Sequence, residues 1–205
     1  MEMGMGARAR SSLPVALQVP NLLTYGRIVA VPLVAGLLLW GTNGARWMAL
    51  TLFILAAVTD FFDGWLARAW QQQSALGRML DPIADKLLVA GVLLMLAANG
   101  QPLHGVHLWA AFIILMREVL VSGLREFLGQ LQASVPVTLL AKWKTALQLV
   151  AIGFLIAGPA GDEVMPYTSQ TGIIGLWLAA LLTMYTGFDY FRAGLHHVIS
   201  EERAA

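Results

Sequence analysis

The chain has 205 residues, of which 58% are hydrophobic and only 12% are charged, and its formal net charge is +1 at pH 7. A soluble domain is usually about half apolar and about a quarter charged, so this composition indicates a membrane protein. The near-zero net charge excludes the broad basic surface that binds nucleic acid. The absence of cysteine excludes disulfides, thiolate zinc sites and cysteine nucleophiles.

The N-terminal stretch MEMGMGARARSSLPVALQVP lacks both the long apolar core and the small-residue cleavage site of a secretory signal. We therefore expect residues 1–20 to be retained as a cytosolic or interfacial segment. Arg8 and Arg10 in this segment suit anionic lipid head groups.

Six apolar stretches follow, and each is long enough to cross a bilayer at roughly twenty residues per crossing. They cover residues 22–40, 47–69, 82–98, 107–128, 143–159 and 172–191. Short connections join them, which favours antiparallel neighbours in one helical bundle. The sequence predicts an all-α, polytopic membrane protein, with a six-helix transmembrane domain over residues 21–192 and a cytosolic tail over residues 193–205.

The orientation of this bundle follows from its lysines and arginines, which collect on the cytosolic side of membrane proteins. With the N-terminus inside, all of the 13 Lys and Arg residues except Arg46 and Arg117 fall on or near the cytosolic side. Both termini are therefore predicted to be cytosolic, and so is the stretch 59–86.

That stretch, TDFFDGWLARAWQQQSALGRMLDPIADK, places four aspartates beside apolar segments. Asp60 and Asp63 end the second predicted helix, and Asp81 and Asp85 begin the third. Spacings of three and four residues put each pair on one face of its helix. A short turn joins the two helices, so the two acidic faces can converge.

Four acids near a membrane need compensating charge, since one charged side chain there costs roughly 3 kcal/mol on insertion scales. Two divalent cations would supply it, and carboxylates without histidine or cysteine favour magnesium, manganese or calcium over zinc. Gly64 leaves room for a ligand to approach the backbone, and Arg68 can donate two parallel hydrogen bonds to a phosphate. Together these features suit a diphosphate ligand better than a bare ion.

The spacing resembles the signature of the CDP-alcohol phosphatidyltransferase family. It reads Asp60-x2-Asp63-Gly64-x2-Ala67-Arg68, then eight residues, then Gly77-x3-Asp81-x3-Asp85, without departure from the pattern. The resemblance implies a six-helix membrane bundle, commonly a homodimer, whose active site opens to the cytosol. The topology predicted from apolar segments and charges agrees with it.

The resemblance also implies a role for each matched residue. Asp60, Asp63 and Asp81 correspond to ligands of a two-metal centre for Mg²⁺ or Mn²⁺. Asp85 corresponds to a residue that contacts one metal and acts as general base. The stretch VPNLLTYGR resembles the family's nucleotide-binding segment at the start of the first helix. The implied nucleotide and diphosphate contacts are Pro20, Asn21, Thr24, Gly64, Arg68, Ser74 and Gly77.

The implied reaction transfers a phosphatidyl group from a CDP-linked lipid to an alcohol that the signature does not define. Charged residues in the stretch MREVLVSGLREFL interrupt an apolar segment, where such charges usually line a cavity. The stretch AKWKTALQ adds two lysines at the start of the next segment. Basic residues on two helices suggest an acceptor that carries its own phosphate. The candidate contacts are Arg117, Arg125, Lys142 and Lys144.

Along about residues 20–190 the chain most resembles bacterial family members that use CDP-diacylglycerol as donor and sn-glycerol 3-phosphate as acceptor. The stretches NLLTYGRIVAVPL, AAVTDFFDGWLAR, LDPIADK, REVLVSGLRE and KWKTALQ carry this similarity. It implies an enzyme of phospholipid biosynthesis in the bacterial inner membrane, which acts among membrane lipids as a homodimer.

Other interpretations remain open on the sequence alone. Phosphatidylglycerol, inositol phosphate or serine as acceptor would leave the signature unchanged. A cation transporter also places acids in a membrane, and a polyprenyl-diphosphate transferase also combines aspartates with magnesium. Arg117 and Glu118 can form an internal ion pair that holds helices together. Lys142 and Lys144 can be anchors at the cytosolic membrane surface.

Overall fold

Six α-helices follow one another within the described part of the chain, as the apolar stretches predicted. The computed structural model describes residues 19–69, 75–130 and 139–202, and no strand occurs within these ranges. The all-α fold is therefore confirmed. The helices are α1 (Val19–Trp40), α2 (Asn43–Ala69), α3 (Ala75–Asn99), α4 (Leu108–Gln130), α5 (Leu139–Asp162) and α6 (Thr168–Glu202), with a 3-10 turn, η2 (Gly105–His107), before α4.

The bounds of α3 differ most clearly from the predicted apolar stretch. The helix begins at Ala75, seven residues before position 82, because the intervening segment ALGRML is rich in good helix formers. Asp81 and Asp85 therefore lie in the second and third turns of α3 rather than at its start. At the other end of the chain, α6 continues past the predicted end at residue 191 to Glu202.

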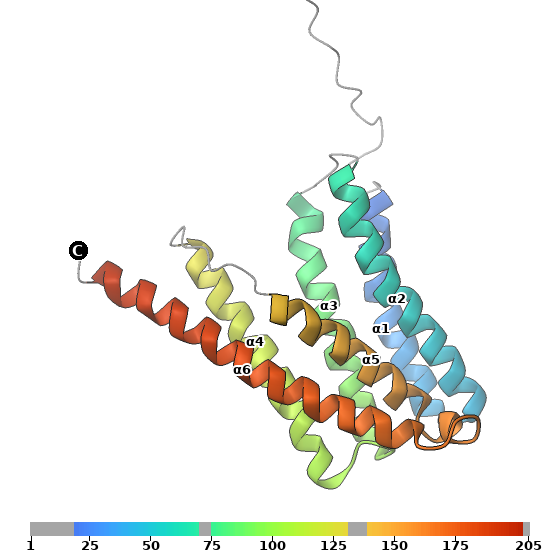
Figure 1. Cartoon of the computed structure of the whole chain (residues 1–205). Coiled ribbons are helices and arrows are strands. Elements are labelled where there is room, and N and C mark those ends of the chain that lie inside the picture. The colour runs from blue at the N-terminus through green and yellow to red at the C-terminus, as the bar shows by residue number, and fades with distance from the viewer. Residues whose placement is uncertain (1–18, 70–74, 131–138, 203–205) are drawn as a thin grey trace, which may run out of the picture.

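The described helices fit a multi-pass membrane protein. Four spans are long and apolar enough to cross a membrane by length and composition: Asn21–Trp40, Gly105–Gly129, Trp143–Asp162 and Thr168–Arg192. α2 and α3 carry the signature aspartates together with arginine and lysine. Both helices nevertheless pack along α1 in the same bundle (Figure 1).

The helices form two groups of three. α1 packs against α2 and α3, and α6 packs against α5 and α4 (Figure 1). α5 joins the groups, since it also contacts α2 and α3. α1 begins, α2 ends and α3 begins at one end of the bundle, which we call the signature end. This arrangement brings the three segments that carry the signature together.

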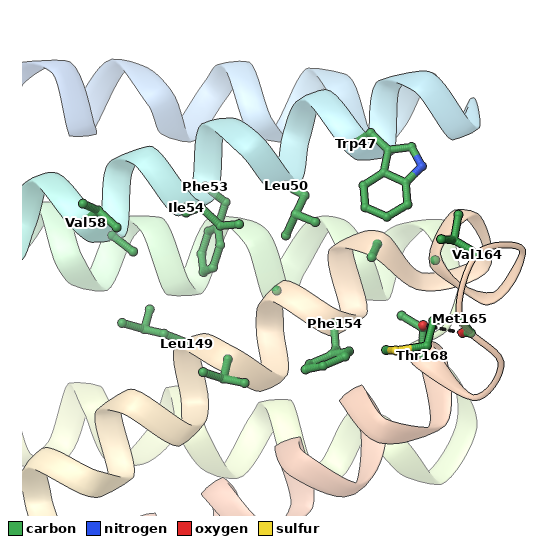
Figure 2. Close-up of a pocket in the computed structure, with 15 residues that line it drawn as sticks. Trp47, Leu50, Phe53, Ile54, Val58, Leu149, Phe154, Val164, Met165 and Thr168 are labelled. Atoms are coloured by element: carbon green, nitrogen blue, oxygen red, sulfur yellow. Dashed lines mark hydrogen bonds between the residues drawn. The ribbon is translucent and has the colours of Figure 1, made fainter.

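A groove of about 540 Å³ lies where α2 faces α5 (Figure 2). Along α2 it extends from Trp47 to Val58, and its lining is almost entirely apolar. The eleven helical rises between these two residues correspond to about 16 Å, roughly half the hydrocarbon thickness of a bilayer. The groove ends two residues before Asp60, so it leads along α2 toward the signature end.

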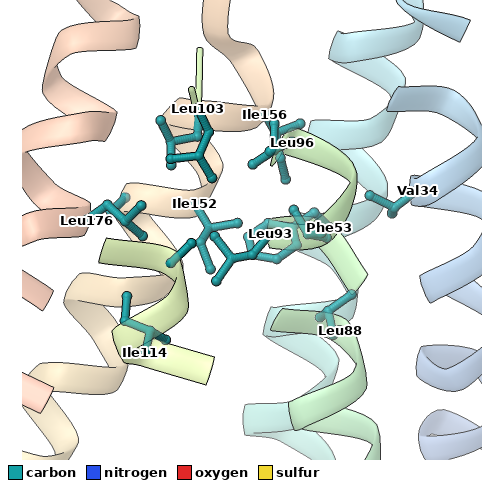
Figure 3. Packing of buried hydrophobic residues seen from close by; sticks show 14 of the residues in the cluster. Val34, Phe53, Leu88, Leu93, Leu96, Leu103, Ile114, Ile152, Ile156 and Leu176 are labelled. Atoms are coloured by element: carbon teal, nitrogen blue, oxygen red, sulfur yellow. The ribbon is translucent and has the colours of Figure 1, made fainter. Parts of the chain in front are cut away.

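The core of the bundle is filled by apolar side chains from every helix. The exposed fraction of each of these side chains is a few per cent or less, and they meet where the two groups of three helices adjoin (Figure 3). They include Val34 of α1, Phe53 of α2, Leu93 of α3, Ile114 of α4, Ile152 of α5 and Leu176 of α6.

α5 is interrupted near its C-terminal end, which frees a backbone carbonyl from the helix. A buried arginine donates a hydrogen bond to that carbonyl. Gly158 has φ 46° and ψ −128°, a conformation that favours glycine, and Pro159 lacks a backbone N–H. Arg46 of α2 donates to the carbonyl oxygen of Ile156 at 3.1 Å and to that of Gln101 at 2.9 Å. Arg46 thereby links α2 to α5 at the end of the bundle opposite the signature.

Candidate active site

The signature residues lie on α2 and α3, as predicted. The structure describes the side chains of Asp60, Asp81 and Asp85. Asp63, Gly64 and Arg68 belong to α2, but the side chains of Asp63 and Arg68 lie outside the described residues, and so does Ser74 as a whole. Pro20 likewise has a defined place in α1 without a described side chain.

The guanidinium group of Arg27, on α1, joins the two acidic helices. Its Nη1 donates to Asp85 Oδ1 at 2.8 Å and forms an ion pair with Asp60 Oδ1. The Arg27 side chain is 0% exposed, whereas those of Asp60 and Asp85 are 38% and 50% exposed. Each carboxylate therefore keeps an open side toward a ligand while Arg27 holds the two together. The predicted convergence of the acidic faces is confirmed for this pair.

Asp81 is tied to α1 by a different residue. Thr24 Oγ1 donates to Asp81 Oδ1 at 2.6 Å. Asn21, Thr24 and Arg27 are all buried, and their spacing of three residues places them along one face of α1. Thr24 thus lies in the site. It was predicted as a nucleotide contact, and the contact that the structure describes is with the signature aspartate Asp81.

Arg27 is a site residue that the sequence analysis missed, because it was counted only toward the orientation of the bundle. Its position three residues after Thr24 and six after Asn21 in an otherwise apolar helix could have indicated it. Gly77, in contrast, was predicted and lies buried in the first turn of α3 at the same end of the bundle.

The donor set of this site suits a divalent cation. Asp60, Asp81 and Asp85 offer carboxylate oxygens, which magnesium and manganese prefer. Within the part of the chain that the structure describes, no three such side chains are grouped tightly enough to form a ready metal cluster. Instead, Arg27 supplies positive charge between Asp60 and Asp85.

A second polar cluster lies between α4, α5 and α6. Glu118 Oε1 accepts a hydrogen bond from Arg117 Nη1 at 3.2 Å and pairs with Lys144 Nζ. Arg117 Nη2 also donates to Thr186 Oγ1 at 3.5 Å. The side chains of Arg117, Glu118 and Lys144 are 15%, 22% and 5% exposed. The ion pair between Arg117 and Glu118, one of the alternatives that the sequence allowed, is therefore present. Lys144 is too buried to be a surface anchor.

The other two candidate contacts of the acceptor phosphate are Arg125 and Lys142. The Arg125 guanidinium carbon lies 5.6 Å from the centroid of the Tyr190 ring, a cation–π arrangement between α4 and α6. Lys142 lies near the start of α5, but its side chain lies outside the described residues.

The chain is similar to known proteins over a range that contains these residues. The model of the CDP-alcohol phosphatidyltransferase family matches residues 17–185, a range that contains the four signature aspartates together with Arg117, Glu118 and Lys144. The chain is also similar over most of its length to curated proteins named CDP-diacylglycerol--glycerol-3-phosphate 3-phosphatidyltransferase.

In Rickettsia bellii the relative is 46% identical over 174 residues, 85% of this chain and 93% of the relative. In Cereibacter sphaeroides it is 42% identical over 221 residues, 90% of this chain and 98% of the relative. In Sodalis glossinidius it is 36% identical over 186 residues, 88% of this chain and 96% of the relative.

Proposed function

The chain belongs to the CDP-alcohol phosphatidyltransferase family, and from that premise we propose that it transfers phosphatidyl from CDP-diacylglycerol to sn-glycerol 3-phosphate, releasing CMP. One observation carries this proposal: a single bundle combines the aspartate signature with a buried cluster that retains positive charge. Relatives whose names state this reaction, at 34–46% identity, support the same donor and acceptor.

Asp60, Asp63, Asp81 and Asp85 are the residues that would hold two divalent cations, Mg²⁺ or Mn²⁺. The family uses divalent metal ions, and the carboxylate donor set of this chain fits them. When bound, such ions withdraw negative charge from the diphosphate and stabilise the departing CMP. Thr24 holds Asp81 through a hydrogen bond, and Arg27 holds Asp60 and Asp85 through ion pairs.

Asp85 is the proposed general base, and its half-exposed carboxylate can reach a substrate hydroxyl. Asp85 takes the hydroxyl proton as the acceptor oxygen attacks the phosphorus attached to diacylglycerol. One P–O bond forms, and the P–O bond to CMP breaks. A carboxylate is a weak base for an alcohol, so positioning and charge stabilisation by the site carry most of the rate enhancement.

The donor's nucleotide and diphosphate would lie at the signature end. Buried Asn21 and Thr24 lie near the start of α1, and buried Gly77 lies near the start of α3 at the same end of the bundle. Glycine lets a phosphate approach the backbone closely. The proposed donor contacts are Pro20, Asn21, Thr24, Gly64, Arg68, Ser74 and Gly77.

An acyl chain of the donor would fit the apolar groove between α2 and α5. The groove opens along the face of α2 and ends two residues before Asp60. A lipid whose diphosphate lay at the signature aspartates would therefore have a matching apolar surface beside it.

The acceptor phosphate would be bound by basic residues of α4 and α5. Arg117 and Lys144 together carry two positive charges against the single carboxylate of Glu118. Arg125 and Lys142 add charge on the same two helices. A phosphate monoester, with a charge of about −1.5 to −2 at neutral pH, complements such a surplus.

We further propose a setting in the bacterial inner membrane, with both termini and the active site in the cytosol and the protein present as a homodimer. The excess of lysine and arginine on one side supports the orientation. The glycerol 3-phosphate and CMP of the reaction are water-soluble, which agrees with a site that faces the cytosol.

The test is CMP release by the purified protein with CDP-diacylglycerol and one acceptor at a time. We expect release with glycerol 3-phosphate and Mg²⁺ or Mn²⁺, and none after chelation. Preferential release with serine, inositol phosphate or phosphatidylglycerol would instead keep the family and refute the acceptor. A cation transporter would release no CMP with any of them.

A further inference from the structure

In the cluster between α4, α5 and α6, Arg117 and Lys144 have more N–H donors than Glu118 accepts. Glu118 Oε1 receives one bond from Arg117 and one from Lys144. A lysine ammonium has three N–H donors and an arginine guanidinium five, so donors remain on both cations. The Arg117, Glu118 and Lys144 side chains together keep a net charge of +1.

Buried polar atoms in this region also lack partners. Arg117 Nε, Gln148 Oε1 and Thr183 Oγ1 are buried and make no hydrogen bond. The Gln148 oxygen can only accept, so the atoms that could donate to an anion are Arg117 Nε and the Thr183 hydroxyl. Such atoms are usually satisfied in folded proteins, so each needs an explanation. An unused guanidinium donor in a cluster with surplus positive charge points to an anion that binds there.

α6 constrains the position of Arg117. A Cβ atom at Gly187 would lie 3.0 Å from Arg117 Cγ and 3.3 Å from Arg117 Nε. An alanine at this position would therefore require Arg117 to shift by a few tenths of an ångström. Thr186, the preceding residue, accepts the hydrogen bond from Arg117 Nη2. The guanidinium group is thus held by α6 on one side and by Glu118 on another.

We propose that Glu118 is a positioning residue for the acceptor, which holds Lys144 and Arg117 together as one phosphate-binding unit, and that Gly187 provides the space this unit requires. Lysine has a flexible stem, and an ion pair that fixes its ammonium before binding lowers the entropy lost when phosphate binds. The inference rests on the proposed function, from which it takes a phosphate-bearing acceptor.

The experiment compares wild type with Glu118→Gln, Glu118→Asp, Gly187→Ala and Gly123→Ala, varying each substrate separately. Loss of a charge-assisted hydrogen bond changes affinity about tenfold or more, so Glu118→Gln should raise the KM for glycerol 3-phosphate by about that factor. The KM for CDP-diacylglycerol should not change. Glu118→Asp should restore part of the loss because it keeps the carboxylate.

Gly187→Ala tests the same unit without changing any charge. It should raise the acceptor KM selectively, because Arg117 must move away from the new methyl group. Gly123→Ala is the matched control on α4, since a Cβ there would meet nothing within 4 Å. It should behave like wild type.

A second measurement is thermal unfolding with and without inorganic phosphate, in the absence of donor. Phosphate should stabilise wild type, and stabilise Glu118→Gln and Gly187→Ala less. A lower melting temperature with unchanged acceptor KM and unchanged phosphate stabilisation would overturn the proposal and leave a purely structural ion pair. A lower acceptor KM in Glu118→Gln would overturn it too, because Glu118 would then compete with phosphate.

The two measurements also separate this inference from the proposed function. If wild type transfers phosphatidyl to another acceptor only, the reaction has been assigned wrongly. The phosphate-dependent melting shift of the variants still decides whether Glu118 and Gly187 position an anion site. If phosphate does not stabilise wild type, the positioning role is refuted even where glycerol 3-phosphate proves to be the substrate.

Discussion

Thr24 on α1 and Asp81 on α3 are 57 residues apart in the chain and are joined by a hydrogen bond of 2.6 Å. One turn further along α1, Arg27 contacts Asp60 and Asp85. α1 is therefore part of the acidic site. The signature residues alone, which lie on α2 and α3, describe only part of the structure that positions these carboxylates.

Replacement of Arg27 by methionine should destabilise the metal-free protein more than the Mg²⁺-loaded one. Breaking a buried ion pair costs about 3–5 kcal/mol, and the partial exposure of both aspartates reduces this to about 1–3 kcal/mol. Bound cations would offset much of the lost charge. Thermal unfolding with and without Mg²⁺ measures the difference. Equal losses in the two conditions would show that Arg27 contributes only packing.

Asp60→Asn, Asp63→Asn and Asp81→Asn should each abolish turnover while the protein still inserts and folds. An amide has nearly the shape of a carboxylate but lacks the negative charge that binds a divalent cation. CMP release at saturating Mg²⁺ is the measurement, with a melting curve as the control for folding. Near wild-type activity in any one variant would remove that residue from the metal ligands.

Asp85→Asn should separate a base from a ligand. If Asp85 mainly takes the acceptor proton, the variant loses transfer but still binds CDP-diacylglycerol in the presence of metal. Binding can be followed by calorimetry or by thermal stabilisation with the donor. A loss of binding as complete as in Asp60→Asn would identify Asp85 chiefly as a ligand.

Lys144→Ala and Arg125→Ala should raise the KM for glycerol 3-phosphate and leave the KM for CDP-diacylglycerol nearly unchanged. A charge-assisted hydrogen bond contributes about 1.5–3 kcal/mol, or roughly ten- to a hundredfold in affinity. The effect of Lys144→Ala should be the larger, because it also leaves Glu118 with only Arg117 as a partner. Equal changes in both KM values would argue against an acceptor site at these residues.

Gly158→Ala should destabilise the fold by about 1–3 kcal/mol, because an L-residue is strained at a positive φ of this kind. Its Cβ would also lie 2.7 Å from Arg46 Nη1. Gly153→Ala is the control on the same helix, since its Cβ would make only an ordinary contact, 3.6 Å from Leu50 Cδ1. Chemical denaturation in detergent compares the two, and equal stabilities would contradict the role given to Gly158.

The sequence predicted the helices and the acidic faces because both depend on local periodicity. Asp60 and Asp63, or Asp81 and Asp85, are neighbours within a helix, so spacing alone places them. Arg27 could not be assigned in this way, since its contact with Asp85 spans 58 residues. Helix packing decides which residue of α1 meets which carboxylate.

The same limit applies to the basic cluster. The sequence offered an acceptor contact or an internal ion pair with Glu118 as alternatives for Arg117, and an acceptor contact or a surface anchor as alternatives for Lys144. The structure joins Lys144 to Glu118 and brings Thr186 of α6 into the cluster. No spacing rule links these positions, because they belong to three different helices.

Under the proposed function, the division of the bundle into two groups of three helices would separate two tasks. The carboxylates and their partners belong to α1, α2 and α3, and the basic cluster belongs to α4, α5 and α6. If the basic cluster binds the acceptor as proposed, substitutions in the second group would alter which alcohol is accepted while the residues that release CMP from the donor remain intact. Such a division would let the fold acquire new lipid head groups in evolution without rebuilding its chemistry, and α5, which contacts both groups, is where the two must stay compatible.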